Sequence, residues 1–228
     1  MATAAPPLSQ AAAPAQPRRV TPSPRWSSPR AVRFKRGLDV VASATALALL
    51  SPLLAGIAIA VKRTSAGPAL FVDWRIGRDQ RPFRCYKFRT MCADAPDRQK
   101  DLEEVNECGG VLFKIREDPR VTSVGVWLRK YSLDELPQLF NILRGEMSLV
   151  GPRPLPTRDV SCMDEWHTQR HLVTPGLTGL WQVNGRSRLD FDDMIRLDLD
   201  YIEDWTPAGD LVIIARTARA VLGSDGAY

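Results

Sequence analysis

From Val40 to Val61 the sequence reads VVASATALALLSPLLAGIAIAV, a run of 22 residues without a charged side chain. A straight helix of this length spans about 33 Å, which is close to the thickness of the hydrocarbon core of a bilayer. Ser51 and Pro52 lie at the middle of the run. Proline removes a helical hydrogen bond, here to the carbonyl of Ala48, and its ring pushes against the preceding turn. The run therefore predicts a membrane helix that bends at Ser51 and Pro52.

Basic residues flank the apolar run on both sides. They are Arg33, Lys35 and Arg36 before it and Lys62 and Arg63 after it. A single straight span would place either the basic N-terminal segment or the folded domain outside, whereas positive charge favours the cytoplasmic side. A re-entrant helix keeps both ends inside, provided that the carbonyls freed at the break find partners such as the Ser51 hydroxyl. We therefore expect a re-entrant helix.

A cleaved signal peptide is the third topology to weigh. Ala58, Ile59 and Ala60 resemble a cleavage site, and Arg18 and Arg19 resemble a twin-arginine signal. However, 36 residues precede the hydrophobic segment that begins near Gly37, and the arginine pair lies far from that segment. These features favour a retained membrane helix.

Composition divides the chain on either side of this helix. Of 228 residues, 31 are Lys or Arg and 26 are Asp or Glu, and residues 1–36 contain seven of the cations and no acid. Residues 1–30 are mostly Ala, Pro, Gln, Ser and Arg, which bury too little apolar surface to offset chain entropy. We therefore predict a disordered basic arm over residues 1–33, a re-entrant helix over 34–63 and a folded domain over 64–228.

The rest of the chain predicts an α/β fold of mixed helices and short strands. Residues 69–91 are typical of two short strands around a turn. Helices are expected over residues 123–144, 163–173, 191–205 and 210–222, the last two amphipathic, with Thr206 as N-cap and Pro207 at the first helical position. A hydrophobic content of 44% excludes a wholly disordered chain. The four cysteines match no zinc or disulfide pattern and indicate reduced thiols in a cytoplasmic setting.

Cations recur at every third position along the predicted hairpin. They are Arg75, Arg78, Arg81, Arg84 and Lys87, followed by Arg89. Gly77 and Pro82 prevent one helix from displaying them all, but a folded hairpin brings several around one anion. A solvated basic surface and a nucleic-acid site are the alternatives. The near-neutral charge of the domain as a whole argues against nucleic acid and favours a small polyphosphate held by arginine.

Two adjacent acids follow Ser132, in the order Ser132–Leu133–Asp134–Glu135. This pattern fits the S-x-x-E capping box, which is a purely structural explanation for both acids. With Ser132 as the cap, however, Pro137 becomes the fifth helical residue and lacks the N–H that this position requires.

A helix that begins at Asp134 avoids this conflict, because Pro137 then lies in the first turn, where donors are free. Both carboxylates would lie at the positive end of the helix dipole, where Asp134 stays ionised, as a nucleophile must. Arg129 and Lys130 are close enough in sequence to hold the anion that Asp134 attacks. Glu135 is close enough to share a divalent cation with Asp134.

Three further patterns were weighed. Arg153 lies between Pro152 and Pro154, which suits a preorganised phosphate or uracil contact, and a plain turn is the alternative. His167 and His171 are four residues apart on a predicted helix but lack a third metal ligand, so we interpret them as surface or core residues. An acidic run indicates a solvated helix face, and the alternative is that one member contributes to a metal or substrate site: Asp190, Asp192, Asp193, Asp198 and Asp200.

Taken in series, these motifs resemble the bacterial sugar transferases known as monotopic phosphoglycosyl transferases. The elements of the resemblance are Phe34–Asp39 (FKRGLD), the Ser51–Pro52 break, Lys87–Met91 (KFRTM), Ser132–Leu139 (SLDELPQL), Gly151–Pro154 (GPRP) and Pro175–Arg186 (PGLTGLWQVNGR). Two departures stand out. Thr174 occupies a position that is often basic in relatives, and the arm stands where many relatives have four transmembrane helices, so we expect the short form.

The resemblance implies transfer of a phosphosugar from a UDP-sugar to undecaprenyl (polyprenyl) phosphate with release of UMP, the initiating step of exopolysaccharide, capsule or O-antigen synthesis. By analogy, Asp134 is the nucleophile, Asp134 and Glu135 hold Mg²⁺, and Lys87, Arg89, Arg129, Arg153 and Arg186 bind substrate. The break at Ser51 and Pro52 and the amphipathic helices would hold this catalytic domain at the lipid headgroups.

The resemblance also implies a location and partners. We expect the bacterial inner (cytoplasmic) membrane, with the active site facing the cytoplasm, contact with membrane lipid, no nucleic acid, and downstream glycosyltransferases; a homodimer remains open. The competing class is a catalytically silent, membrane-tethered binding or regulatory protein, against which the intact Asp134 and Glu135 argue. The identity of the sugar stays open, because hydroxyl discrimination depends on contacts in the pocket.

Overall fold

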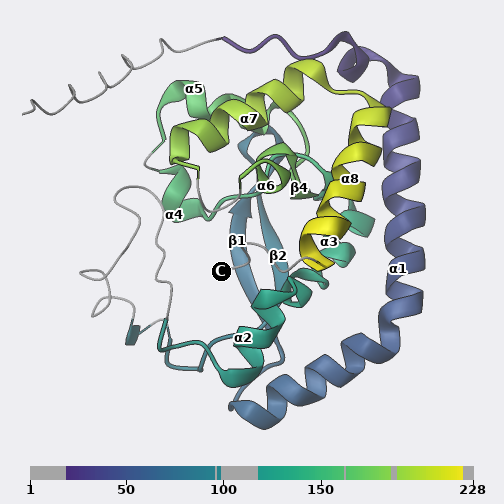
Figure 1. Ribbon diagram of the computed structural model, residues 1–228. Helices are drawn as coiled ribbons and strands as arrows, with labels where there is room; N and C mark the ends of the chain where they lie inside the picture. The colour runs from purple at the N-terminus through teal and green to yellow at the C-terminus, as the bar shows by residue number, and fades with distance from the viewer. Residues whose placement is uncertain (1–18, 96, 99–117, 162, 186–188, 223–228) are drawn as a thin grey trace, which may run out of the picture.

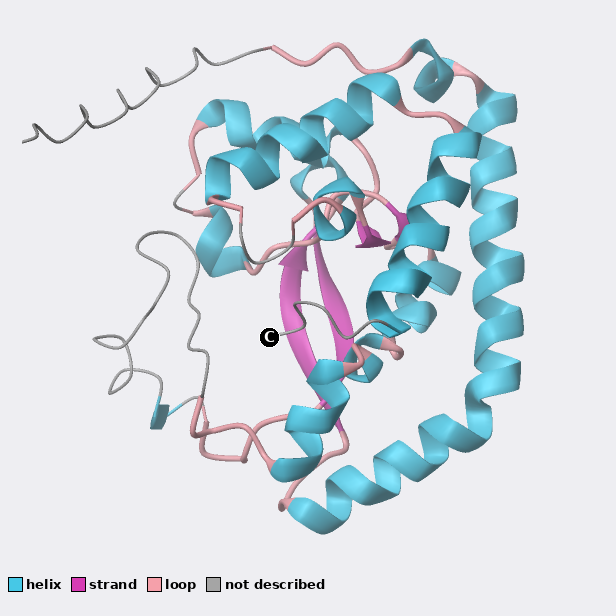
Figure 2. Cartoon of the chain, in the orientation of Figure 1, coloured by secondary structure: helices cyan, strands magenta, loops and turns pink. Residues whose placement is uncertain are grey.

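One long helix runs along the side of a folded domain in the computed structural model (Figure 1). The structure describes residues 19–95, 97–98, 118–161, 163–185 and 189–222. The long helix is α1 (Pro29–Thr64), and helices surround a small antiparallel hairpin in the domain beside it (Figure 2). This arrangement confirms the predicted mixture of helices and short strands.

The helix α1 is long and apolar enough to cross a bilayer. An 18-residue window within it has a mean hydropathy of 2.2, and only 11% of that window is buried, unlike the core helix of a soluble protein. Ser28 caps its N-terminus by accepting a hydrogen bond from the N–H of Ala31, and Pro29 occupies the first helical position, where it needs no donor.

Pro52 lies inside α1, and the helix changes direction sharply part-way along its length (Figure 1). The Ser51 hydroxyl donates a hydrogen bond to the carbonyl of Ala48 at 2.9 Å, which is the partner that the sequence predicted for the freed carbonyl. The bend therefore leaves no broken hydrogen bond at Ala48. The re-entrant topology itself stays a prediction.

The N-terminal boundary of the folded part differs from the prediction. Residues 19–33 were assigned to the disordered arm, but the structure packs residues 20–26 onto the domain and starts α1 at Pro29. Val20 is buried, and the indole of Trp26 stacks on Trp205 with ring centroids 4.1 Å apart and donates to the carbonyl of Ile202. The prediction from composition did not detect the buried contacts of Val20 and Trp26, because most residues around them are polar or small. Residues 1–18 of the arm lie outside the described residues.

The hairpin pairs β1 (Leu70–Ile76) antiparallel with β2 (Pro82–Phe88), around the 3₁₀ turn η2 (Arg78–Gln80). Phe71 lies opposite Lys87, and Asp73 lies opposite Cys85. Because side chains alternate between the faces of a strand, one face of the hairpin carries Arg75, Cys85 and Lys87.

The short helix α3 (Gln138–Arg144) is fixed to this hairpin by a side chain. Asn141 is fully buried; its Oδ1 accepts from the N–H of Tyr86 at 3.1 Å, and its Nδ2 donates to the carbonyl of Arg84 at 2.6 Å. These bonds satisfy the free edge of β2, where unpaired backbone groups would otherwise remain. The segment before α3 is thereby placed against the hairpin.

The remaining elements complete the domain. They are η1 (Pro24–Ser27), α2 (Ser123–Lys130), η4 (Leu133–Glu135), β3 (Ser148–Val150), α4 (Thr157–Val160), α5 (Glu165–Thr168), η5 (Gln169–Leu172), β4 (Gly176–Thr178), α6 (Leu180–Val183), α7 (Phe191–Asp204) and α8 (Pro207–Leu222). β3 and β4 pair in parallel. Thr206 caps α8 as expected, accepting from the N–H of Gly209 at 2.9 Å. The helices predicted over 123–144 and 163–173 are each divided by turns.

A buried ion pair ties α1 to the domain. Lys35 Nζ lies 2.6 Å from Asp210 Oδ2 and 2.9 Å from the carbonyl of Val150. Tyr201 donates to Asp210 Oδ1 at 3.0 Å, and Trp205 Nε1 donates to Asp210 Oδ2 at 3.1 Å. The cluster joins α1, β3, α7 and α8, so α1 is held beside the loop that follows Val150.

Replacing Lys35 with methionine is expected to lower the free energy of unfolding by about 3–5 kcal/mol, because Asp210 then remains buried without its cation. Thermal unfolding in detergent measures the loss. Arg33→Met, an exposed cation on the same helix, is the matched control and should change little. Adding Asp210→Asn to Lys35→Met should recover part of the stability. An unchanged melting temperature in Lys35→Met would contradict this role.

Candidate active site

The two adjacent acids lie on the short 3₁₀ turn η4, between α2 and α3. Ser132 before it adopts a left-handed backbone (φ 54°, ψ 24°), and its side chain makes no capping hydrogen bond. The capping-box explanation of these acids is therefore wrong. A left-handed serine costs about 1–3 kcal/mol, and it lets the chain turn abruptly after α2.

The helix that follows the acids begins at Gln138 rather than at Asp134, with Pro137 as its N-cap. Proline is tolerated at this position because the N–H groups of the first helical turn have no acceptor within the helix. Both acids consequently lie ahead of α3, on the 3₁₀ turn η4, which packs against β2.

Glu135 is bound by two cations. Its Oε1 lies 2.8 Å from Lys87 Nζ and also accepts from Arg153 Nη2, while its Oε2 accepts from Arg153 Nη1 at 3.0 Å. Burial would raise the pKa of Glu135, but Arg153 and Lys87 outweigh burial and hold that pKa well below its usual range. Glu135 therefore remains ionised and orients both cations.

Asp134 differs from its neighbour, since no hydrogen bond or ion pair to its carboxylate is found within the described part of the chain. Burial and the adjacent Glu135 raise the pKa of Asp134, against the opposing effect of Lys87, Arg129 and Arg153. Among the described residues, Asp134 is thus a carboxylate without a direct partner, and three cations act on it beside the adjacent Glu135. These are the surroundings of a nucleophile that attacks an anionic substrate.

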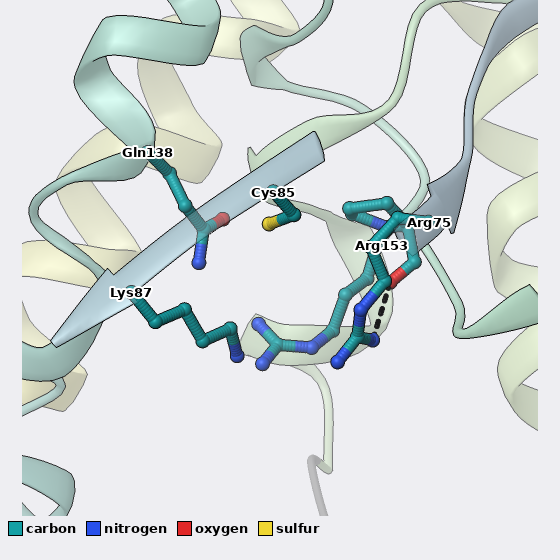
Figure 3. Close-up of a pocket in the computed structure, with 6 residues that line it drawn as sticks. Arg75, Cys85, Lys87, Gln138 and Arg153 are labelled. Carbon is teal, nitrogen blue, oxygen red and sulfur yellow. Dashed lines mark hydrogen bonds between the residues drawn. The ribbon is translucent and has the colours of Figure 1, made fainter. Parts of the chain in front are cut away.

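A small, tightly packed pocket lies next to Glu135, whose partners Lys87 and Arg153 line it together with Arg75, Cys85, Gln138 and Pro154. Figure 3 shows that the charged ends of Lys87, Arg75 and Arg153 converge at one side of it. Arg75 is oriented by its Nη1, which donates to the carbonyl of Pro154 at 3.0 Å, and by an ion pair with Asp73. Converging cations of this kind suit the oxygens of a phosphate group.

Arg75 is a site residue that the sequence analysis did not assign to substrate, although it belongs to the cationic run. The run recurs every three residues, whereas a strand alternates every two, so only some of its members share a face. Arg84 lies opposite Trp74 on the other face, and Arg78 and Arg81 lie at the turn. If the alternation of a strand is applied to the cationic run, Arg75 and Lys87 fall on the same face of the hairpin.

The structure does not bring Arg89 to this cluster. Its guanidinium donates to the carbonyls of Ser65 and Ala66 in the turn after α1. Arg129 is closer: its Nε donates to the Thr90 hydroxyl at 3.0 Å, and its charge lowers the pKa of Asp134. Arg186 lies outside the described residues, so its assigned role stays a prediction.

Arg153 is held in place from behind. Arg170 is 1% exposed, and its Nη2 donates both to the carbonyl of Arg153 and to Asp198 Oδ2, each at 2.6 Å. Gly151 also allows close packing, since a Cβ there would lie 2.6 Å from the carbonyl oxygen of Thr174. The GPRP and PGLTG motifs therefore support each other through backbone contact, and Asp198 is a buried ion-pair partner rather than part of a solvated helix face.

The two histidines are structural, as interpreted. His167 is buried, and its Nε2 lies 3.1 Å from Asp192 Oδ1. Burial, then Arg170, lowers the pKa of His171 to about 4. Among the described residues, no three His, Cys, Asp or Glu side chains gather as a metal cluster.

Together, the fold and this site define a protein that has a membrane-type helix and a cationic pocket, and the pocket suits a phosphate-bearing ligand. The family model described as Bacterial sugar transferase matches residues 30–224. The chain belongs to the bacterial sugar transferase family.

Individual relatives agree with this assignment. Galactosyl transferase CpsE of Streptococcus agalactiae is 42% identical over 194 residues, which are 85% of this chain and 43% of CpsE. Undecaprenyl-phosphate galactose phosphotransferase of Salmonella typhimurium is 42% identical over 204 residues, which are 87% of this chain and 43% of that protein. Exopolysaccharide production protein ExoY of Rhizobium meliloti is 41% identical over 198 residues, which are 85% of this chain and 88% of ExoY. The chain thus spans less than half the length of the first two and most of the third.

Proposed function

We propose that this protein transfers a phosphosugar from a UDP-sugar to undecaprenyl phosphate, or a similar polyprenyl phosphate, and releases UMP. The observation that carries the proposal is the carboxylate of Asp134, which has no partner among the described residues and interacts with the charges of Lys87, Arg129 and Arg153. The names of relatives support the reaction class, among them undecaprenyl-phosphate glucose phosphotransferase of Komagataeibacter xylinus. The apolar helix α1 supports a substrate that resides in the membrane.

The reaction would proceed in two displacements. A carboxylate oxygen of Asp134 attacks the phosphorus that bears the sugar, and the bond from that phosphorus to the UMP oxygen breaks, so that UMP leaves with the electron pair. A phosphate oxygen of the polyprenyl acceptor then attacks the same phosphorus. The acyl-phosphate bond breaks, the Asp134 carboxylate is restored, and the product is a polyprenyl-diphosphate-sugar.

The cations of the pocket stabilise the charge that develops at phosphorus. Arg153 and Lys87 are held against Glu135 before substrate arrives, so little reorganisation is needed during the reaction. Arg75 faces the same pocket and is suited to a non-bridging oxygen of the diphosphate. Arg129 does not line this pocket but interacts electrostatically with Asp134, and is suited to the phosphate of the acceptor.

We propose Mg²⁺ as the cofactor, held by Asp134 and Glu135. Mg²⁺ commonly takes one or two protein carboxylates and completes its coordination with water and substrate phosphates. The donor set fits, since Asp134 is unpaired and Glu135 Oε2 accepts from Arg153 Nη1 alone among the described residues. When bound, the ion would neutralise charge on the diphosphate.

We also propose that α1 is re-entrant at the inner membrane and that the site faces the cytoplasm, where nucleotide sugars are made available. The cations at both ends of the apolar run support this orientation. The product would then initiate a surface polysaccharide, for which the exopolysaccharide function named for ExoY is the support.

The test uses purified full-length protein in nanodiscs with undecaprenyl phosphate, Mg²⁺ and a panel of UDP-glucose, UDP-galactose and their N-acetylated forms. We expect UMP release from at least one donor, with a preference of about tenfold or more, because a pocket that hydrogen-bonds sugar hydroxyls discriminates among them. Radiolabel should move from that donor into the lipid fraction. If no donor in the panel releases UMP, the protein is better described as a silent binding protein.

A further inference from the structure

An apolar cavity of about 310 Å³ lies between α2 and the C-terminal end of α8, apart from the cationic pocket. Its lining residues are Trp127, Tyr131, Leu133 and Val221. The rings of Trp127 and Tyr131 contact each other, with centroids 4.7 Å apart. Trp127 is nevertheless 62% exposed, so a large apolar surface faces outward at this point.

This cavity adjoins the proposed nucleophile. Leu133 immediately precedes Asp134 on the turn η4, so one wall of the cavity and the reactive carboxylate belong to the same three residues. Arg129 lies two residues from each lining aromatic, so its side chain leaves α2 on another face, where it donates to Thr90 and interacts electrostatically with Asp134. Lys130 Nζ lies 5.5 Å from the centre of the Tyr131 ring. The apolar cavity therefore has one cation, Lys130, beside its aromatic wall, and its Leu133 wall is the residue next to the reacting group.

The cavity also adjoins the membrane helix. Ile57 and Val61, in the part of α1 after Pro52, pack with Leu128 of α2 and against Leu133. Exposed Val126 stands beside Trp127 on α2. Tryptophan and tyrosine beside cations are typical of the boundary between headgroups and acyl chains. Leu133 thus belongs both to the cavity wall and to the cluster that packs on α1.

We propose that this cavity binds the isoprene units nearest the phosphate of the polyprenyl acceptor, an assignment that rests on the proposed function. The chemistry is that of one ligand with two parts: an apolar chain against Trp127 and Tyr131, and a phosphate directed toward Arg129 and Asp134. The volume is at the lower end for small-molecule sites, so it holds the first part of the chain while the rest remains in lipid.

The experiment separates the two half-reactions. Covalent labelling by radiolabelled UDP-sugar requires no acceptor, whereas discharge of the labelled enzyme requires one. In Trp127→Ala we expect labelling at the wild-type rate and a KM for undecaprenyl phosphate about tenfold higher, without a matching fall in kcat. With methyl phosphate, which has no chain, the discharge rates of variant and wild type should agree. Trp127→Phe should restore most of the affinity.

Trp74→Ala is the matched control, because Trp74 is a half-exposed tryptophan on β1 that does not line the cavity. It should keep the wild-type KM. As a second measurement, a diazirine-bearing isoprenyl phosphate should cross-link within residues 127–133, and excess undecaprenyl phosphate, but not a phosphatidylglycerol vesicle, should compete.

Three outcomes would overturn the assignment: an unchanged KM in Trp127→Ala, equal losses with methyl phosphate and undecaprenyl phosphate, or cross-linking that ordinary phospholipid abolishes. Failure of the proposed function is a different result, namely no labelling of the wild-type enzyme by any UDP-sugar.

Discussion

Asp134→Asn is expected to abolish turnover and covalent labelling, with a loss of at least ~1,000-fold, because an amide is not a nucleophile toward phosphorus. The fold should survive. The pKa of Asp134 is raised by burial and by Glu135, which means that the folded protein disfavours its charge relative to water. Removing that charge should therefore cost little stability, and the melting temperature is the check.

The measurement for Asp134 is a burst of UMP when the enzyme meets the donor without acceptor. Wild type should release up to one equivalent and retain label that hydroxylamine removes, as expected of an acyl phosphate. Asp204→Asn, an exposed aspartate at the end of α7, should behave like wild type. Labelling that persists in Asp134→Asn would place the nucleophile elsewhere, and kinetics that require both substrates bound together would exclude the two-step reaction.

Glu135→Gln is expected to lower the rate of labelling by about 100-fold, since Lys87 and Arg153 lose the carboxylate that positions them. It should also change the pH dependence. Labelling requires ionised Asp134 and falls as pH falls through its pKa, which Glu135 raises. Without Glu135 the acid limb of the profile should move to lower pH, and the concentration of Mg²⁺ needed for half-maximal rate should rise.

Lys87→Met is expected to move the acid limb of the pH–rate profile in the opposite direction, to higher pH. The reason is that the charge of Lys87 lowers the pKa of Asp134. Glu165→Gln, an exposed acid on α5, should leave the profile unchanged. Acid limbs that move in the same direction in Glu135→Gln and Lys87→Met would contradict this electrostatic account. A normal Mg²⁺ dependence in Glu135→Gln would remove Glu135 from the proposed metal site but leave its role toward the cations.

Local patterns in the sequence were sufficient for several features. The uncharged run from Val40 to Val61 predicts the membrane-type helix, and Pro52 predicts its bend, because both depend on residues that are neighbours along the chain. Alternation and turn residues predict the hairpin, and Thr206 predicts the start of α8. The order of motifs also indicated the family to which the chain belongs.

The contacts of the site depend instead on packing between distant segments. Arg75, Lys87 and Arg153 converge because the register of β1 and β2 and the buried contact from Arg170 bring them together, whereas Arg89 is turned toward the carbonyls after α1. The docking of Trp26 on Trp205 likewise joins segments that are far apart in the sequence. The sequence shows which charged residues are present and how far apart they lie along the chain. Coulomb interactions, however, depend on separation in space. Only the folded chain therefore shows which cations act on Asp134 and Glu135.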